Sequence, residues 1–253
     1  MRGASGSVAI IVQARAGSAR LPGKVLMPLV AGRTMLSLML ERLKLSALAD
    51  VIILATSEER ADDAVAAEAA SSGVEVFRGS EGDVLSRFVG AAKQFGAGVI
   101  VRLCADSPLH DAEIVDRCLR EYLDKSRTVD YVSNLMPETF PYGSAVEVFA
   151  FDVLLRLDRL SSSLSWREHV TQFLHLNKHL FSLSNVSDEG DHSHLRWAVD
   201  YPEDFAFVRC VYEELYQEGK PFSYRDVLAL MERCPQLAEI NGMRNERLAP
   251  SRA

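Results

Sequence analysis

The sequence is poor in the features that mark secreted, membrane-spanning or metal-cluster proteins. Its 253 residues include only four cysteines, and no two of them are spaced as CxxC. We therefore expect buried free thiols rather than a disulfide framework or a zinc knot. The first apolar run covers only residues 8–12 and leads at once into polar residues. Such a run is too short for a membrane span and unlike a signal peptide, so the sequence predicts a cytoplasmic location.

The sequence also has no excess of positive charge. Its formal net charge is −7 at pH 7, with 28 Lys and Arg against 35 Asp and Glu. Nonspecific binding to nucleic acid or to an anionic membrane needs a basic surface, so we expect neither as a partner. The fingerprints GxxxxGK[ST], GxGxxG, HExxH and GxSxG are missing as well. Their absence argues against the common P-loop, dinucleotide-binding, zinc-protease and serine-hydrolase types.

The order of the apolar runs predicts an α/β fold. Through the first half of the chain, short runs suited to buried strands alternate with segments of helical period. The expected strands cover residues 8–12, 51–55, 74–77 and 98–103, and the expected helices cover residues 35–45, 62–71, 83–95 and 111–123. This alternation is typical of βαβ units and of a mainly parallel sheet flanked by helices. Ligands of such sheets bind beyond the carboxyl ends of the strands.

The second half of the chain is less regular. Here the expected strands cover residues 131–134, 145–150, 180–185 and 195–199, and the expected helices cover residues 152–160, 166–176, 205–216 and 224–233. The sequence contains no internal repeat, heptad run or low-complexity linker. We therefore predict a single domain over residues 1–253 with an irregular α+β second half.

Three cations follow the first expected strand on a loop rich in small residues. They are Arg15, Arg20 and Lys24. The small residues between them are Gly17, Ser18 and Gly23. Backbone N–H groups of such a loop can close on anionic oxygens, and fixed cations offset the charge. The cations could be ordinary solvated surface charges, but their position directly after a buried strand favours a phosphate site. In an acidic protein, this indicates a small phosphorylated ligand.

Two aspartates occupy comparable positions later in the chain. Asp106 follows the strand expected at residues 98–103, and Asp200 follows the strand expected at residues 195–199. Two carboxylates at strand ends could hold Mg²⁺, which usually takes one or two protein carboxylates together with phosphate oxygens. Each could instead cap a helix, because each lies two residues before a proline. Spacing alone favours the capping interpretation.

Seven segments of the chain occur in an order that is specific to one family. They run from Val8 to about Tyr216 and read IIVQARAGSARLPGKVL, VFRGSEGDVLSRF, VIVRLCADSPLHD, YVSN, VEVF, REHVT and HLRWAVDYPEDF. In this order they resemble the cytidylyltransferase family that includes the KDO and acylneuraminate cytidylyltransferases, in particular its spore-coat-polysaccharide branch. The branch commonly has Gly where this chain has Ala105, a change that would narrow the approach of a nucleotide. It also often has Met where this chain has Ala16, a change that we do not interpret.

The resemblance implies both a fold and a reaction. The fold is a Rossmann-like sheet of the nucleotide-diphospho-sugar transferase type. The reaction moves CMP from CTP to a hydroxyl of a sugar or sugar acid and releases pyrophosphate, with Mg²⁺ as cofactor, for cell-surface polysaccharide or glycoconjugate synthesis. Positioning and charge stabilisation suffice for this transfer, and no covalent intermediate is needed.

The resemblance also assigns residues to roles. The implied catalytic residues are Arg15, Lys24 and Asp106. The implied nucleotide-binding residues are Gln13, Ala14, Arg15, Ser18, Arg20, Lys24, Arg78, Gly79 and Ser80. The implied Mg²⁺ ligands are Asp106 and Asp200, which replaces the capping interpretation of both. The implied acceptor-binding residues are Asn134, Glu147, Arg167, Glu168 and His169. The family's central insertion corresponds to residues 137–199, which would bind the acceptor and form a homodimer.

Three other functions stay open at the level of the sequence. The same fold could use another nucleotide, such as UTP or GTP, to activate a sugar phosphate. A nucleotide-sugar glycosyltransferase is less favoured, because no Asp-x-Asp metal motif follows the expected core strands. A noncatalytic relative would bind CTP without releasing pyrophosphate.

Overall fold

The apolar run at residues 8–12 forms the central strand of the molecule, β1 (Ser7–Gln13). The computed structural model describes residues 6–243. Parallel strands pair with β1 on both sides, β4 (Val51–Ser57) on one and β6 (Ala97–Cys104) on the other. Because β1 is covered on both faces as well, Ile10, Ile11 and Val12 are fully buried.

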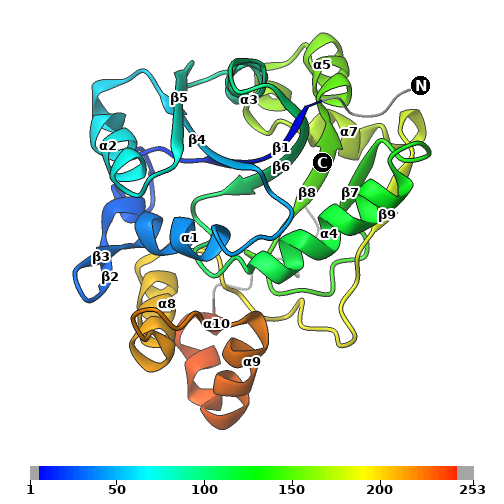
Figure 1. Ribbon diagram of the computed structural model, residues 1–253. Helices are drawn as coiled ribbons and strands as arrows, with labels where there is room; N and C mark the ends of the chain where they lie inside the picture. Colours follow the sequence, from blue (N-terminus) through cyan, green and yellow to red (C-terminus); the bar gives the residue numbers. More distant parts are fainter. Residues whose placement is uncertain (1–5, 244–253) are drawn as a thin grey trace.

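Seven strands form one sheet in the order β5-β4-β1-β6-β8-β7-β9 (Figure 1). The outer strands are β5 (Glu75–Gly79), β7 (Tyr131–Ser133), β8 (Glu147–Ala150) and β9 (Leu183–Asn185). β8 pairs antiparallel with both β6 and β7, whereas β7 and β9 are parallel. The sheet is therefore parallel except for β8. This confirms the predicted α/β class with a mainly parallel sheet.

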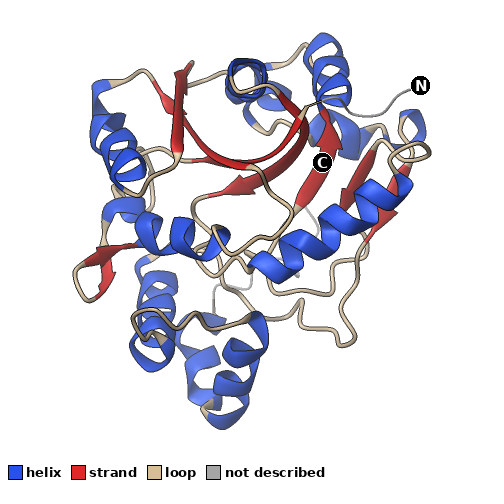
Figure 2. Ribbon diagram, in the orientation of Figure 1, coloured by secondary structure: helices blue, strands red, loops and turns tan. Residues whose placement is uncertain are grey.

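Helices cover both faces of the sheet, and each face has its own hydrophobic core (Figure 2). The first core includes residues of α1 (Met35–Leu43), α2 (Asp63–Ser71), α4 (Ala112–Lys125), α8 (Pro202–Leu215) and α9 (Tyr224–Arg233). The second includes residues of α3 (Val84–Gln94), α5 (Phe151–Leu160) and α7 (Gln172–Leu176). Alternate residues of β1 divide between them, since Val12 lies in the first core and Ile11 in the second.

Short elements complete the described chain. They are η1 (Lys24–Leu26), β2 (Pro28–Val30), β3 (Arg33–Thr34), η2 (Arg60–Asp62), α6 (Leu164–Glu168), η3 (Lys178–Leu180), η4 (Pro235–Ala238) and α10 (Glu239–Gly242). All four cysteines are unbridged. Between residues 6 and 243, no helix combines the length and the apolar character needed to cross a bilayer. The predicted single domain of residues 1–253 includes residues 1–5 and 244–253, which lie outside the described part.

Two expected elements of the second half are wrong. The helix expected over residues 166–176 is split into α6 and α7, because Val170 has φ of 47° and its side chain is fully buried. A β-branched residue at positive φ cannot continue a right-handed helix. The strand expected over residues 195–199 does not form either. The N–H groups of Trp197 and Ala198 both donate to the Tyr142 carbonyl, so no regular ladder is possible.

Candidate active site

A cavity of about 550 Å³ opens at the carboxyl ends of β1 and β6. Gln13 and Ala14 line it from β1, and Arg102, Ala105 and Asp106 line it from the end of β6 and the turn that follows. These two strands are neighbours in the sheet, although β4 and β5 lie between them in the chain. The chain order thus reverses here, and open α/β sheets bind ligands at such switch points.

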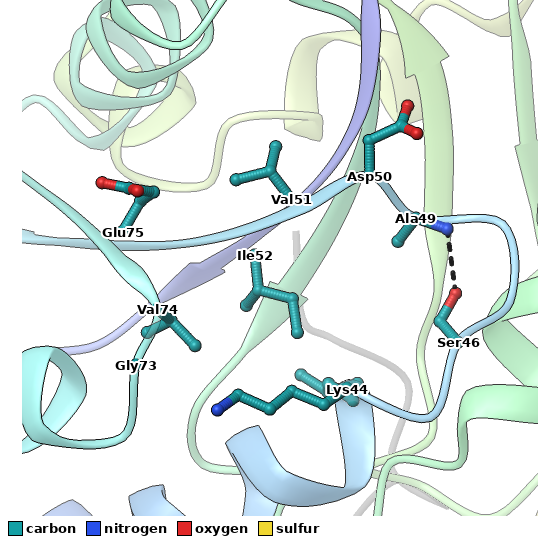
Figure 3. A pocket seen from close by; sticks show the side chains of 10 residues that line it. Lys44, Ser46, Ala49, Asp50, Val51, Ile52, Gly73, Val74 and Glu75 are labelled. Atoms are coloured by element: carbon teal, nitrogen blue, oxygen red, sulfur yellow. Dashed lines mark hydrogen bonds between the residues drawn. The ribbon is translucent and has the colours of Figure 1, made fainter.

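A smaller hollow of about 280 Å³ lies at the opposite ends of β4 and β5 (Figure 3). Its charged side chains already serve to join segments of the chain. Lys44 donates from Nζ to the Ser72 carbonyl, and Asp50 accepts from the Val8 N–H at 2.8 Å. The cavity at the carboxyl ends, which contains the cationic loop, is therefore the stronger candidate for an active site.

The loop after β1 is held closed by backbone contacts and by one buried carboxylate. Gly23, with φ of 71°, donates from its N–H to the Ala16 carbonyl at 2.9 Å. Ala16 in turn donates to Oδ1 of Asp62 at 2.6 Å. Burial alone would raise the pKa of Asp62, but the N–H groups of Ala16 and Ser57 and the Ser57 hydroxyl lower it below its ordinary value. An ionised Asp62 therefore anchors the loop that carries Arg15, Arg20 and Lys24.

Lys24 links the loop to both predicted metal-binding aspartates. Its Nζ lies 3.3 Å from Oδ1 of Asp200 and 3.9 Å from Oδ2 of Asp106, and it donates to the Val199 carbonyl. Only 9% of Lys24 is exposed. The structure thus brings together three residues that are up to 176 positions apart in the chain. The positive charge of Lys24 is thus offset by two carboxylates, as a buried charge requires.

Asp200 is surrounded by further cations. Nη2 of Arg20 lies 2.8 Å from its Oδ1, and Nη2 of Arg196 lies 2.9 Å from its Oδ2. Burial alone would raise the pKa of Asp200, but the charges of Lys24 and Arg20 lower it. Asp204 holds this arrangement in place, because it pairs with Nε of Arg196 at 2.8 Å and accepts from the Asp200 N–H at 2.9 Å.

Neither Asp106 nor Asp200 caps a helix. The N-cap of α4 is Asp111, whose side chain accepts from the Glu113 N–H. The carboxylate of Asp204 accepts from the N–H of Tyr201, the N-cap of α8, at 3.0 Å. The structure thus leaves Asp106 and Asp200 available for the cavity, which both of them line.

Six of the nine predicted nucleotide-binding residues line the cavity, and three lie outside its wall. The six are Gln13, Ala14, Arg15, Ser18, Arg20 and Lys24. Of the other three, Arg78 pairs with Asp63 at 2.6 Å and donates to the carbonyls of Ser57 and Glu59. Ser80 instead accepts, through its carbonyl, a hydrogen bond from Arg87 at 3.1 Å. Gly79 pairs with Ser57 in the sheet.

The predicted acceptor-binding residues divide in the same way. Glu168 and His169 line the cavity, and Glu168 lies 3.7 Å from Arg15. The other three serve the surrounding fold. Asn134 is 1% exposed and bonds the backbone at residues 144 and 146. Arg167 pairs with Asp83 at 2.6 Å and Asp158 at 2.7 Å.

Glu147 is buried behind the cavity and reaches it through Arg102. Its carboxylate pairs with Arg102, accepts from the Tyr131 hydroxyl at 2.7 Å, and lies 3.3 Å from Nε2 of His175. Burial alone would raise the pKa of Glu147, but Arg102 and His175 lower it far below its ordinary value. Arg102 also donates to Oε1 of Gln13 at 3.1 Å, so this buried pair orients a side chain that lines the cavity.

Sequence analysis missed several residues of this site. Arg87, Arg102 and Tyr142 line the cavity, and Arg196 supports Asp200. Arg102 carried a usable signal, since it is a lone charge in the apolar strand GVIVRL. Arg87 and Arg196 carried none, because a charged residue in a helix or loop is most often on the surface.

The oxygen ligands present suit a hard divalent cation. Within residues 6–243, no group of three or more His, Cys, Asp or Glu side chains is arranged to hold a metal ion. Asp106 and Asp200 nevertheless share one cationic neighbour, the Lys24 ammonium. The Asp106 side chain is 38% exposed. Two carboxylates fit Mg²⁺ only if the ligand's phosphate oxygens complete the coordination.

Comparisons with known proteins show to which family this chain belongs. A family model described as cytidylyltransferase matches residues 9–238. The uncharacterised protein MJ1063 of Methanocaldococcus jannaschii is 37% identical over 91% of this chain and 93% of its own length. The spore coat polysaccharide biosynthesis protein SpsF of Bacillus subtilis is 31% identical over 91% of this chain and 96% of its own. A solved cytidylyltransferase from Leptospira borgpetersenii has a TM-score of 0.88 and 33% identity, and the match covers 92% of this chain and 97% of that one. This chain is therefore a member of the cytidylyltransferase family, with a relative in its spore-coat-polysaccharide branch.

Proposed function

We propose that this enzyme transfers CMP from CTP to a hydroxyl of a sugar or sugar acid and releases pyrophosphate, with Mg²⁺ as cofactor. The observation that carries the proposal is the meeting of Arg15, Arg20 and Lys24 with Asp106 and Asp200 in one cavity at the carboxyl ends of β1 and β6. Family membership and the SpsF relative support a product used in cell-surface polysaccharide or glycoconjugate synthesis.

In this proposal, the loop residues bind the triphosphate. Arg15 and Lys24 hold phosphate oxygens, and Arg20 and Ser18 shape the loop around them. The acceptor hydroxyl gives up its proton to solvent as its oxygen attacks the α-phosphorus in line. The new oxygen–phosphorus bond forms, and the bond to the pyrophosphate oxygen breaks. Arg15 and Lys24 offset the negative charge that grows on the leaving oxygens. Such preorganised charges are effective because they need not reorganise as the negative charge develops.

Gln13 and Ala14 face the base and ribose in this proposal. Arg78, Gly79 and Ser80 contribute from outside the cavity wall, through the backbone that bonds Arg87. Glu168 and His169 face the acceptor, while Asn134, Glu147 and Arg167 support the walls of that region.

Asp106 and Asp200 are the proposed Mg²⁺ ligands. A bound Mg²⁺ would offset charge on the phosphate oxygens. Asp200 already bonds Arg20, Lys24 and Arg196, and Arg20 is the most exposed of these cations, with 52% of its side chain accessible. We therefore expect the metal to bind together with the nucleotide, whose phosphates give Arg20 another partner.

The proposal is tested by measuring CTP-dependent pyrophosphate release across a panel of sugars, sugar acids and phosphorylated polyols. With an acceptor found, Asp106→Asn should lower turnover by about 100-fold or more, as loss of a positioned charge does. Its fold should persist, because among residues 6–243 the carboxylate accepts a single hydrogen bond, from Ser107 at 3.0 Å. Asp124→Asn, on the exposed face of α4, is the matched control and should keep full activity. Full activity of Asp106→Asn with Mg²⁺ would refute the metal assignment.

Thermal shift with the four ribonucleoside triphosphates tests the choice of nucleotide. Mg²⁺ alone should leave Tm unchanged, whereas Mg²⁺ with CTP should raise it, because a ligand that binds only the folded state stabilises that state. A larger shift with UTP or GTP would favour the sugar-phosphate alternative instead.

We also propose that residues 137–199 form an acceptor-binding and dimerisation region within a single domain of residues 1–253. Support comes from leucines that this segment exposes, notably Leu164 at 82% and Leu176 at 64%. Exposed apolar side chains of this kind mark protein interfaces. The free thiols fit action in a reducing compartment such as the cytoplasm.

A further inference from the structure

Arg87 is a buried cation in the cavity wall, and none of the carboxylates within residues 6–243 lies within ion-pair distance of it. It lies on α3, lines the cavity and is only 2% exposed. Within residues 6–243, its one hydrogen bond runs from Nη1 to the Ser80 carbonyl at 3.1 Å, and its Nε has no hydrogen-bond partner. It makes no ion pair with a described carboxylate within 4.0 Å.

The other buried arginines in the described chain differ from Arg87 in this respect. Arg42 lies 3.7 Å from Asp111 and donates to two backbone carbonyls. Arg196 pairs with Asp204 at 2.8 Å, and Arg102 pairs with Glu147. Burying a charge without an opposite one is unfavourable, so proteins keep such groups only where something else compensates them.

The electrostatic surroundings of Arg87 lack an anion at short range. Burial lowers its pKa, and the neighbouring charge of Arg15 lowers it further. The attraction of Asp62, Glu81 and Asp83 acts from beyond ion-pair distance and does not restore the ordinary value. Two cations, one of them from the cationic loop, therefore act on each other at the cavity wall.

The segment at the end of β5 holds this side chain. The carbonyl of Ser80 accepts from Nη1 of Arg87 at 3.1 Å. Gly79 lies beside the arginine stem, since a Cβ there would be in ordinary contact with Cγ of Arg87 at 3.4 Å and closer to Cε1 of Phe77, at 3.0 Å. Ser80, predicted from the sequence to bind the nucleotide, thus serves to position Arg87.

We propose that Arg87, together with Arg15, binds a phosphate oxygen of the nucleotide. The proposal rests on the function proposed above, in which the loop binds CTP. A bound phosphate would supply the opposite charge that the buried guanidinium lacks, and Arg is well suited to that contact because its planar fork matches phosphate geometry.

The test compares Arg87→Met with Arg42→Met, since both replace a buried arginine by an apolar side chain of similar length. The probes are CTP, inorganic tripolyphosphate and cytidine, each titrated calorimetrically, with Tm measured on the ligand-free proteins. Arg87→Met should bind CTP and tripolyphosphate about 10- to 100-fold more weakly, as expected for one charge-assisted hydrogen bond. Its affinity for uncharged cytidine should not change. Arg87→Lys should recover part of the loss.

Stability should separate a ligand-binding role from a structural one. Arg87→Met should keep or raise the Tm of the ligand-free protein, because it removes an uncompensated buried charge. Arg42→Met should lower Tm and leave tripolyphosphate binding intact, because Arg42 is paired and lies outside the cavity.

Each outcome decides the matter. Unchanged affinity of Arg87→Met for CTP and tripolyphosphate would overturn the role of Arg87 and leave the proposed function standing. The wild type could instead bind tripolyphosphate but not CTP, with the binding lost in Arg87→Met. That result would support the anion site at Arg87 and overturn the proposed function. A wild type that binds neither CTP nor tripolyphosphate would overturn both proposals. A lowered Tm of Arg87→Met together with normal binding would overturn the role of Arg87 alone.

Discussion

Single charged side chains decide the chemistry of this cavity, and several of them act through a neighbour. Arg102, in the central sheet, has two roles. It neutralises Glu147, and it donates a hydrogen bond to Oε1 of Gln13. That hydrogen bond leaves the amide nitrogen of Gln13 as a donor toward the cavity. The buried pair therefore orients a cavity-lining side chain, although Glu147 itself does not line the cavity.

Glu147→Gln tests this pair through the pH dependence of stability. The pKa of Glu147 is lowered from its ordinary 4.5, so its contribution is fully present above that value and is lost as pH falls through the folded-state pKa. At about pH 7 the variant should lose about 3–5 kcal/mol of the free energy of unfolding, because Arg102 is left buried and unpaired. Urea unfolding from about pH 7 to about pH 3 should then show the two curves converging below about pH 4.5.

The control for that series is Glu218→Gln, an exposed glutamate that should follow the wild type at every pH. Parallel curves for Glu147→Gln and wild type, separated by a constant free energy, would show that the pKa of Glu147 is the same in the folded and unfolded states and that Arg102 does not lower it.

Among the elements, the irregular segment 195–200 has the largest effect on the site. It replaces the expected strand because its N–H groups do not form a regular ladder with a neighbouring strand. Those of Trp197 and Ala198 both donate to the Tyr142 carbonyl, and that of Val199 donates to the Asp106 carbonyl at 2.7 Å. This docking places Asp200 beside Lys24. A regular strand would have pointed alternate side chains to opposite faces of the sheet and could not have made these contacts.

Gly143→Ala tests the docking of this segment. Gly143 has φ of 102°, and a Cβ there would lie 2.3 Å from the Ala198 nitrogen, so the segment must move. We expect kcat/KM to fall by about 100-fold, the usual effect of displacing a catalytic group by about 1 Å, with a loss of about 1–3 kcal/mol in the free energy of unfolding. Gly242→Ala, where a Cβ meets nothing within 4 Å, is the control. Wild-type kinetics of Gly143→Ala would show that the close approach is not needed for the site.

At the scale of the whole molecule, the second half of the chain completes the sheet and exposes several leucines. β8 and β7 extend the sheet beyond β6, and α5 and α7 cover the face that α3 also covers. The exposed leucines of α6 and α7 lie in this half. A homodimer formed through residues 137–199 would bury them.

Light scattering after size exclusion should therefore give about twice the chain mass of 28.0 kDa. The double variant Leu164→Glu, Leu176→Glu should shift the mass to that of one chain, because buried carboxylates would oppose association. Leu45→Glu is the control, since Leu45 is 53% exposed but lies outside residues 137–199. A wild type that elutes at one chain mass would contradict the proposed dimer.

The sequence by itself determined the regular first half and the cationic loop. Runs such as residues 8–12 and 51–55 are apolar, β-branched and short, and such runs form buried parallel strands in almost any packing. The loop of Arg15, Arg20 and Lys24 could be found because its cations lie close together in the chain and follow a strand. The order of the seven matching segments identified the family for the same reason, since it is a property of linear order.

Only the tertiary structure decided what surrounds that loop. The cavity combines Arg87 and Arg102 with loop residues far away in the chain, and helical or strand period does not record such proximity. Arg196 joins them through Asp200, which pairs with Lys24. The break at Val170 and the irregular segment 195–200 arose in the same way, because burial of Val170 and the close approach at Gly143 override local preference. Local sequence patterns thus located the edge of the sheet where the cavity lies, and long-range packing determined which charged side chains line that cavity.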